Sequence, residues 1–159
     1  MKTDLNYMIT YARADKALVD DLLARLGVEF SLSKKFNYSK WIDDDIYSHN
    51  EEGFTEQITN KMEESDFVLL GASPIYFTRD FIKTHEIPII AREENKKLAI
   101  LVSIKPLDYS NHDLMGFEKY NFFNLNGKSY AECISELEKD AFAHKLFLHI
   151  QAIMESRTV

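Results

Sequence analysis

The chain has 159 residues and a formal net charge of −7, and it is long enough for a single globular domain with a sizeable core. Nucleic acid is an unfavourable partner, because phosphate binding requires clustered Lys and Arg. No apolar run approaches the roughly 20 residues that span a bilayer, so we expect no membrane contact. The single cysteine, Cys133, excludes an internal disulfide and a thiolate zinc cluster, and with no secretory signal we expect a cytoplasmic protein.

The first part of the chain predicts a strand, a helix and a second strand. Alternating apolar residues predict the first strand over residues 5–11. Asp15 is placed to cap the following helix, whose apolar stripe covers residues 18–26. Gly27 stands where a helix end favours a residue without Cβ, and the second strand is predicted within residues 36–42.

A long acidic loop follows the second predicted strand, from Asp43 to Gly53. Long loops inside compact domains are often functional. The next predicted helix carries Phe54, Ile58 and Met62 on one face. The acids at residues 43–45 resemble the pocket of a phosphoryl-accepting receiver domain, but that pocket draws acids from separate strand ends and needs a later lysine. A solvated acidic turn is the better interpretation of three consecutive acids in one loop.

The stretch from Asp66 to Glu86 is predicted to organise the sheet. Its short apolar run at residues 67–70, followed by a turn at residues 73–74, predicts a strand that is buried on both faces. Ligands bind at the carboxyl edge of open parallel sheets, and the turn lies at that edge. The helix predicted over residues 81–90 therefore carries Glu86 toward a cleft.

The remaining sequence predicts a strand at residues 98–102, an irregular segment at residues 106–119, a fifth strand at residues 120–125 and a helix over about residues 129–154. The predicted buried face of that helix consists of Tyr130, Ile134, Leu137 and Ala141. Alternating strands and helices predict one α/β domain over the whole chain, with a flavodoxin-like parallel sheet of four or five strands and helices on both faces.

Several common kinds of active site are absent from the sequence. The five glycines are scattered, so they form neither a dinucleotide fingerprint nor a phosphate-binding P-loop. The five histidines lack metal-ligand spacing, and no Gly-x-Ser-x-Gly elbow occurs. We therefore expect no bound metal and no cofactor.

Four pieces of the sequence occur in a characteristic order. They are ITYARAD at residues 9–15, WIDD and Gly-Phe within residues 41–54, SDFVLL and SPIY within residues 65–76, and Glu86. Together they resemble the Toll/interleukin-1 receptor (TIR) domain family, as its opening box, its BB loop, its third strand with a Ser-Pro turn, and its catalytic glutamate. The resemblance covers nearly the whole chain, from residue 7 to about residue 154.

The sequence also departs from the family pattern. Thr10 replaces the usual Ser, and residues 78–80 lack the Ser of the family. Four residues before Glu86, where the family often has Trp, this chain has Ile82, and Phe81 lies one residue earlier. This departure favours an alternative of another class, a non-catalytic TIR scaffold that signals through homotypic association.

The resemblance implies an NAD glycohydrolase of a bacterial anti-phage immune system, which cleaves NAD to nicotinamide and linear or cyclic ADP-ribose. NAD is then the substrate and no cofactor is needed. Nicotinamide is already a cationic leaving group, so one carboxylate, Glu86, has only to stabilise the oxocarbenium-like ribose. The candidate substrate-binding residues are Tyr11, Arg13, Trp41, Asp43, Ser73, Phe81 and Ile82.

Individual roles follow from side-chain chemistry. Arg13 is suited to pair with a phosphate, and Asp43 either contacts the ribose or caps its turn. Trp41 offers a stacking face, although a Trp that ends a strand is more often part of the core. The resemblance further implies that the BB loop docks onto a neighbouring copy, that the active form is a filament or oligomer, and that a nucleotide-sensing domain is fused to or associated with the chain.

Overall fold

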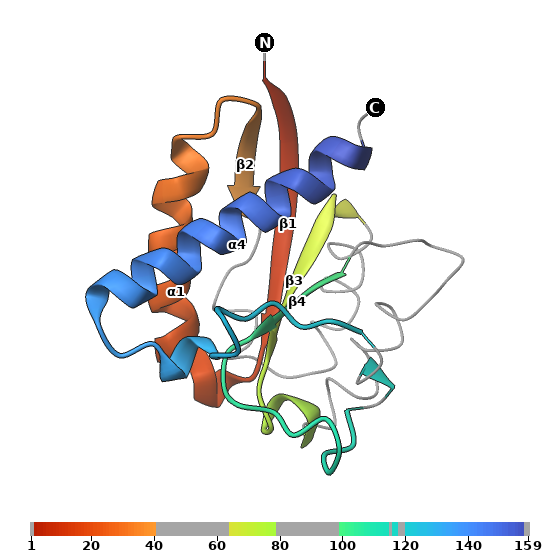
Figure 1. Ribbon diagram of the computed structural model, residues 1–159. Helices are drawn as coiled ribbons and strands as arrows, with labels where there is room; N and C mark the ends of the chain where they lie inside the picture. The colour runs from red at the N-terminus through yellow and green to blue at the C-terminus, as the bar shows by residue number, and fades with distance from the viewer. Residues whose placement is uncertain (1, 41–63, 79–98, 115, 118–119, 158–159) are drawn as a thin grey trace.

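The computed structural model describes residues 2–40, 64–78, 99–114, 116–117 and 120–157 (Figure 1). The strands are β1 (Thr3–Tyr11), β2 (Phe36–Lys40), β3 (Phe67–Ala72) and β4 (Ala99–Ser103). The α-helices in these ranges are α1 (Lys16–Ser31) and α4 (Glu136–Arg157). Short 3-10 helices are η1 (Arg13–Asp15), η3 (Tyr76–Thr78) and η6 (Tyr130–Glu132).

The strands form one parallel sheet in the order β2-β1-β3-β4. Tyr7 of β1 lies opposite Lys40 on β2 and opposite Phe67 on β3, and Leu69 of β3 lies opposite Ile100 on β4. This arrangement confirms the predicted α/β, flavodoxin-like class. The strands run downward in Figure 1, and the carboxyl ends of β1, β3 and β4 lie toward its lower edge.

The predicted fifth strand at residues 120–125 is not formed. Phe123 alone pairs with Val102 in a parallel bridge at the outer side of β4. Its N–H donates to the carbonyl of Leu101 at 2.7 Å, and its carbonyl accepts from the N–H of Ser103 at 2.9 Å. The sheet of the described residues therefore has four strands, the lower of the two predicted numbers.

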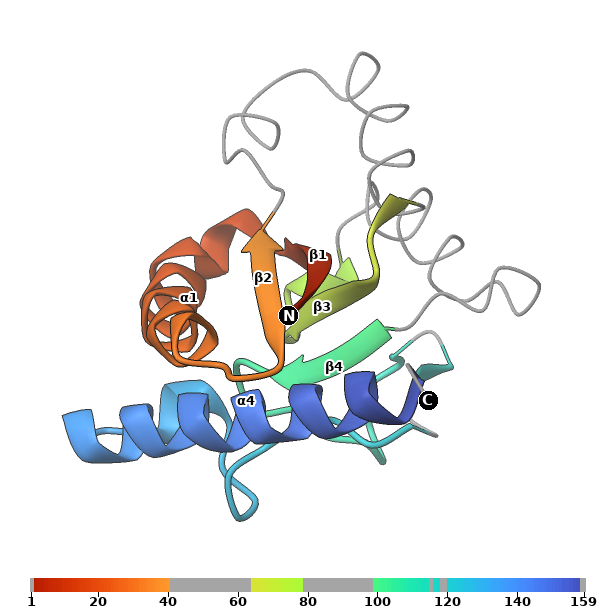
Figure 2. The same cartoon turned by 90° about the horizontal axis from the view of Figure 1, so that it is seen from above.

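Both faces of the sheet are buried, and all six residues of β3 are buried. One core cluster lies between the strands β1 and β3 and the helices α1 and α4. Its members include Leu5, Tyr7, Ile9, Phe67 and Leu69 from the strands, and Leu22, Phe30, Phe142, Leu146 and Ile150 from the helices. The other combines Met8, Val68, Leu70 and Leu101 with Tyr76, Leu114, Phe117 and Phe122. Figure 2 shows α1 and α4 together on one side of the sheet. A strand between two apolar layers explains the uninterrupted apolar run of β3.

Arg25 of α1 joins the two helices through a network of carboxylates. Its guanidinium contacts Asp21 at 3.1 Å, Glu136 at 2.5 Å and Asp140 at 2.6 Å. The hydroxyl of Tyr130 donates to Asp21 and is the main cause that lowers the pKa of that carboxyl. Two residues of α1 and three residues near the start of α4 thus hold the helices in register.

The end of α1 differs from the prediction. Gly27 lies inside the helix, which continues to Ser31 and buries Phe30. The chain turns at Ser33, whose hydroxyl donates to Oε1 of Gln151 at 2.7 Å and accepts from the N–H of Phe36 at 3.3 Å. Burial of Phe30 outweighs the helix-breaking tendency of one glycine, which amounts to about 1 kcal/mol.

The predicted face of the last helix is wrong. Ile134 and Leu137 are 85% and 80% exposed. The residues of α4 that are buried are Phe142, Ala143, Leu146, Phe147, Ile150 and Met154. Tyr130 is buried, but it belongs to the separate helix η6, so its position does not continue into the helical period of α4.

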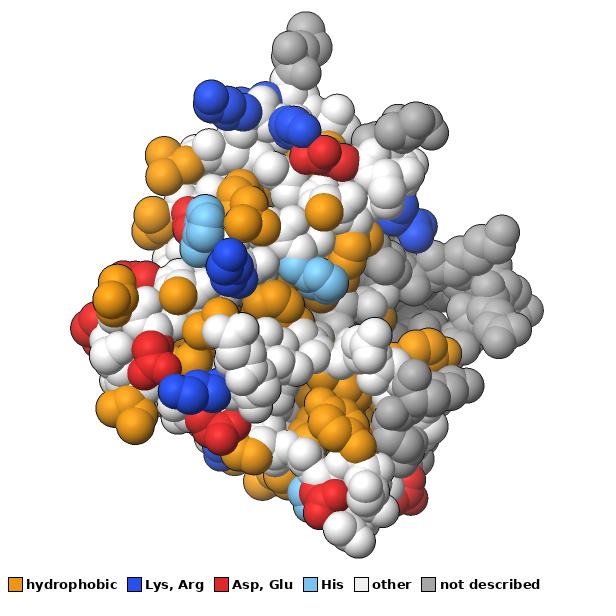
Figure 3. Space-filling view, in the orientation of Figure 1, with side chains coloured by type: hydrophobic (Ala, Val, Ile, Leu, Met, Phe, Trp, Pro, Cys, Tyr) orange, Lys and Arg blue, Asp and Glu red, His pale blue; other side chains and the backbone are white. Residues whose placement is uncertain are grey.

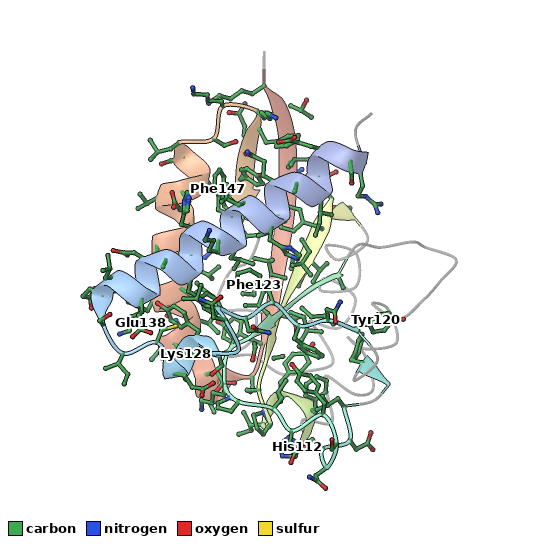
Figure 4. All side chains as sticks on the ribbon, in the orientation of Figure 1. His112, Tyr120, Phe123, Lys128, Glu138 and Phe147 are labelled. Carbon is green, nitrogen blue, oxygen red and sulfur yellow. The ribbon has the colours of Figure 1, made fainter. Side chains whose placement is uncertain are left out.

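The surface over α4 carries charges of both signs between apolar side chains (Figure 3). At the start of α4, Lys128 and Glu138 lie side by side, with 2.7 Å between Nζ and Oε2 (Figure 4). Within the described ranges, no helix combines the length and the apolar character needed to cross a bilayer.

The corrected face of α4 can be tested by paired truncations. Leu146→Ala removes a fully buried side chain and is expected to lower the free energy of unfolding by about 2–5 kcal/mol. Leu137→Ala, at an exposed position, is expected to change it by about 0.5 kcal/mol or less. Urea unfolding followed by circular dichroism measures both values. A larger loss for the variant at residue 137 would restore the face predicted from sequence.

Candidate functional site

The carboxyl ends of the strands carry a group of polar residues in which Asp15 is central. Three connections meet at this edge: η1 after β1, η3 after β3, and the loop after β4 (Figure 1). In a sheet of order β2-β1-β3-β4 the two neighbours of β1 are reached in opposite directions, so the crevice between β1 and β3 is the topological switch point. Ligands of such folds bind outside the strand ends at this point.

Asp15 has a fully buried side chain and two partners from distant parts of the chain. The hydroxyl of Ser73, the residue after β3, donates a hydrogen bond to Oδ2 of Asp15. The ammonium of Lys105, two residues after β4, lies 2.8 Å from Oδ1. This carboxylate therefore ties the connection after β1 to those after β3 and β4, across the switch point.

The buried charge is balanced by one cation. An isolated carboxylate away from water is strongly destabilising, whereas a paired one with a hydrogen bond is tolerated. Oδ1 accepts no hydrogen bond in the described structure, so the ammonium of Lys105 compensates it as an ion pair. The side chain of Asp15 is 0% exposed and that of Lys105 is 39% exposed, so the positive end of the pair faces outward.

Local hydrogen bonds fix the partners of Asp15. The N–H of Tyr76 donates to Oγ of Ser73 at 3.2 Å and to its carbonyl at 3.1 Å, which forms the turn into η3. The hydroxyl of Tyr76 lies 3.3 Å from Oγ1 of Thr10 in β1. The N–H groups of residues 104 and 105 both donate to the carbonyl of Ala72, at 2.8 and 3.3 Å.

The strand ends at the switch point are closely packed around Gly71. A Cβ added to Gly71 of β3 would lie 3.3 Å from Cβ of Tyr11 and 3.3 Å from Cγ1 of Ile104. Such separations are tighter than ordinary van der Waals contact, so a side chain here would require Tyr11 or Ile104 to shift by a few tenths of an ångström. The absence of a side chain at Gly71 thus matches the close packing of Tyr11 and Ile104 around it.

The loop after β4 is held by its own polar groups. The carboxylate of Asp108 accepts the N–H groups of Ser110 and Asn111, both at 3.0 Å, and the N–H of Asp108 donates to Nδ1 of His112 at 3.0 Å (Figure 4). A hydrogen bond from the side chain of Asn111, at 2.7 Å, is the main cause that lowers the pKa of Asp108. The loop that follows Lys105 is thus folded on itself.

The structure describes three of the substrate-binding residues predicted from sequence. Arg13 is exposed in η1 and forms no ion pair with another described residue. Tyr11 is 3% exposed and lies in the core under α1 and α4. Ser73 is 0% exposed, and its hydroxyl donates a hydrogen bond to Asp15 and accepts one from the N–H of Tyr76. Arg13 is therefore the accessible one of the three.

The other predicted site residues lie outside the described residues. They are Glu86, Trp41, Asp43, Phe81 and Ile82. The acidic loop from Asp43 to Gly53 lies outside them as well, and so do the predicted helices at residues 54–62 and 81–90.

Sequence analysis missed two members of the cluster. Asp15 was predicted to cap α1, and it does stand at the N-cap position, but its side chain makes no capping hydrogen bond. Lys105 was not singled out, although its ammonium lies 2.8 Å from Oδ1 of Asp15. The signal that was available is a lysine directly after a buried strand, at the edge where acids of other strand ends gather.

The cluster differs from the pocket of a receiver domain. The residue after the central strand β3 is Ser73, which cannot form the acyl phosphate of a phosphoryl-accepting aspartate. Within the described residues, no three His, Cys, Asp or Glu side chains are grouped closely enough to hold a metal ion.

Comparisons with known proteins add no family assignment: no family model, no curated protein and no solved structure matches the chain.

The link between Asp15 and Ser73 can be measured with a double-mutant cycle. Asp15→Asn and Ser73→Ala each leave a buried polar group poorly paired and are expected to lower the free energy of unfolding by about 1–3 kcal/mol. Because the two side chains are directly bonded, the cycle is expected to give a coupling energy of about 0.5–3 kcal/mol. Urea unfolding of the four proteins supplies the values.

The matched control combines Asp15→Asn with Ser33→Ala. Ser33 is also a buried serine, but it lies before β2, at the opposite edge of the sheet. The effects of this pair are expected to add within about 0.5 kcal/mol. Equal coupling in both cycles would show that Asp15 and Ser73 do not interact specifically.

Proposed function

We propose that the chain is an NAD glycohydrolase that cleaves NAD to nicotinamide and ADP-ribose, as the effector of a bacterial anti-phage immune system. The observation that carries the proposal is the anchored polar cluster at the β1/β3 switch point, where sheets of this class bind nucleotides. The motif resemblance adds the reaction class and the family glutamate. A cytoplasmic setting and activation by self-assembly belong to the same proposal.

Glu86 is the catalytic residue in this proposal. Departure of neutral nicotinamide leaves positive charge on the ribose, and a carboxylate near that ribose lowers the barrier electrostatically. The leaving group needs no proton, so the two-carboxylate arrangement of ordinary glycoside hydrolysis is not required. Arg13, exposed at the same strand edge that carries Asp15, is suited to bind a phosphate of the dinucleotide.

A non-catalytic scaffold that signals through homotypic association is the second candidate. Two observations favour it: the side chains of Tyr11 and Ser73, both predicted to bind substrate, are buried. A sheet edge closed by its own side chains is compatible with a protein that only presents surfaces to other copies. Incubation with NAD, followed by chromatography of released nicotinamide, separates the two candidates.

Removal of the charge of Glu86 tests the enzymatic proposal. Glu86→Gln keeps the shape of the side chain and is expected to lower NAD turnover by about a hundredfold or more. The matched control is Glu138→Gln at the start of α4, which is expected to leave turnover unchanged (Figure 4). Parent-like turnover of the Glu86→Gln variant with an unchanged circular dichroism spectrum would remove Glu86 from the mechanism.

Assembly is expected to control the activity. A head-to-tail contact through the loop at residues 43–53 does not close on itself and produces filaments. Association of copies has an entropic cost, so a single copy is expected to rest in a weakly active state. Specific activity should then rise with protein concentration, and Asp44→Lys should reduce the rise without unfolding the domain.

The measurement is the rate of nicotinamide release per mole of protein over about a hundredfold range of concentration, with light scattering of the same samples. Constant specific activity from a monomer throughout this range would show that assembly has no part in the reaction.

A further inference from the structure

We infer that Lys105 is an anion-binding residue of the site and contacts the diphosphate of NAD. The inference rests on the proposed function, because it assigns a role to a residue at the same strand edge. It adds a residue that the sequence motifs do not include. It is based on three features of the ion pair between Lys105 and Asp15: its position at the strand edge, the contacts that hold it, and the greater exposure of Lys105.

Lys105 occupies the position from which a side chain meets a nucleotide. It follows β4 by two residues, and its backbone N–H is bonded to the carbonyl of Ala72 at the end of β3. Dinucleotides bind these folds across the switch point, with their phosphates at the carboxyl ends of the strands. A lysine is a compact, strongly charged partner for phosphate.

The ammonium is held in place before any ligand arrives. Nζ lies 2.8 Å from Oδ1 of Asp15, and Oδ2 of that carboxylate is held by Ser73. Less rotamer freedom remains to be lost on binding than for a free surface lysine, and such preorganisation favours affinity. An ammonium has three N–H donors, so one ion pair with Asp15 does not exhaust its capacity to bind a ligand.

The pair presents its positive end outward. The side chain of Asp15 is 0% exposed and that of Lys105 is 39% exposed. The ammonium is therefore the member of the pair that a ligand can reach. Arg13 adds a second positive charge to the same connection as Asp15, and it is exposed.

Lys16, Asp20 and Asp108 also carry charge near this edge, and each has a described partner. Lys16 and Asp20, at the start of α1, neutralise each other at 2.6 Å. Asp108, in the same loop as Lys105, directs its oxygens to Ser110 and Asn111. We therefore assign Lys105, together with the exposed Arg13 at the same strand edge, to the anionic subsite.

The test compares ligands with and without phosphate. Calorimetry measures the affinities of ADP-ribose, ADP and adenosine for the full chain and for Lys105→Gln. Loss of one charge-assisted hydrogen bond is expected to weaken ADP-ribose and ADP binding about tenfold and to leave adenosine binding within about twofold. Lys105→Arg is expected to retain most of the affinity for both phosphate ligands.

Kinetics provide a second readout that a purely structural role would not produce. Because the diphosphate is bound alike in the ground state and the transition state, Lys105→Gln should raise KM for NAD about tenfold with little change in kcat. Lys34→Gln, a matched change of an exposed lysine before β2 at the opposite sheet edge, should alter neither constant.

The variant of Lys105 leaves the carboxylate of Asp15 unpaired, so its folding is checked by circular dichroism. If Lys105→Gln does not fold, the double variant Lys105→Gln/Asp15→Asn removes both charges together and takes its place in the same titrations. It is expected to show the same loss for ADP-ribose and ADP as the single variant.

The possible failures can be told apart. Binding of ADP and ADP-ribose that depends on Lys105, without NAD cleavage, would overturn the proposed function and support the anionic subsite. NAD cleavage with unchanged KM and unchanged ADP-ribose affinity in the variant would overturn the role of Lys105 alone. An equal loss for adenosine and for ADP would also overturn it, because the change would then be structural.

Discussion

The buried carboxylate of Asp15 is the constraint on which this edge of the sheet depends. A charge removed from water must find compensation inside the protein, and here the compensation comes from Ser73 and Lys105. These partners follow two different strands, so the charge is stabilised only when all three strand ends are in register. The interaction is thus a condition on the tertiary structure rather than a local cap of α1.

Several other features become necessary once that register is fixed. Gly71 is closely approached by Tyr11 at the end of β1 and by Ile104, the residue after β4, so a residue without a side chain suits this position. Tyr76 turns back over the edge and bonds both Ser73 and Thr10. The helices α1 and α4 are clamped by Arg25 on the same side of the sheet, which holds the start of α1, and with it Asp15, against the strands. A rigid floor of this kind is the precondition for a preorganised site.

The sequence was sufficient for the features that depend on local periodicity. The apolar runs predicted β3 and β4 within about two residues, since strands buried on both faces need no partner pattern to be recognised. It failed for α4 because residues 130–132 form a separate 3-10 helix and the chain changes direction before Glu136. The period extrapolated from Tyr130 therefore placed Ile134 and Leu137 on the wrong side.

For the candidate site too, the sequence predicted what local motifs contain and missed what depends on contacts between distant residues. A motif places Arg13 and Ser73 at the strand edge, but only the tertiary structure shows that Ser73 is buried beneath it. The partners of Asp15 are 58 and 90 positions away along the chain, and no window of local sequence connects them. Asp15 was therefore interpreted as an N-cap, the commonest local use of an aspartate before a helix.

The burial of Asp15 also limits the chemistry that this edge can perform. A carboxylate with 0% exposure, neutralised by an ammonium and hydrogen-bonded by a serine, cannot approach a ribose or stabilise a positive charge that develops outside the protein. The outward-facing charge of the pair is the ammonium of Lys105, which in the proposed site suits a phosphate and disfavours an oxocarbenium-like ribose beside it. Any glycoside-cleaving site above this floor must then take its stabilising carboxylate from another segment and must hold the ribose away from Lys105. A dinucleotide meets that requirement, because its diphosphate separates the reacting ribose from the anionic subsite, and Glu86 is the carboxylate to which we assign the transition state.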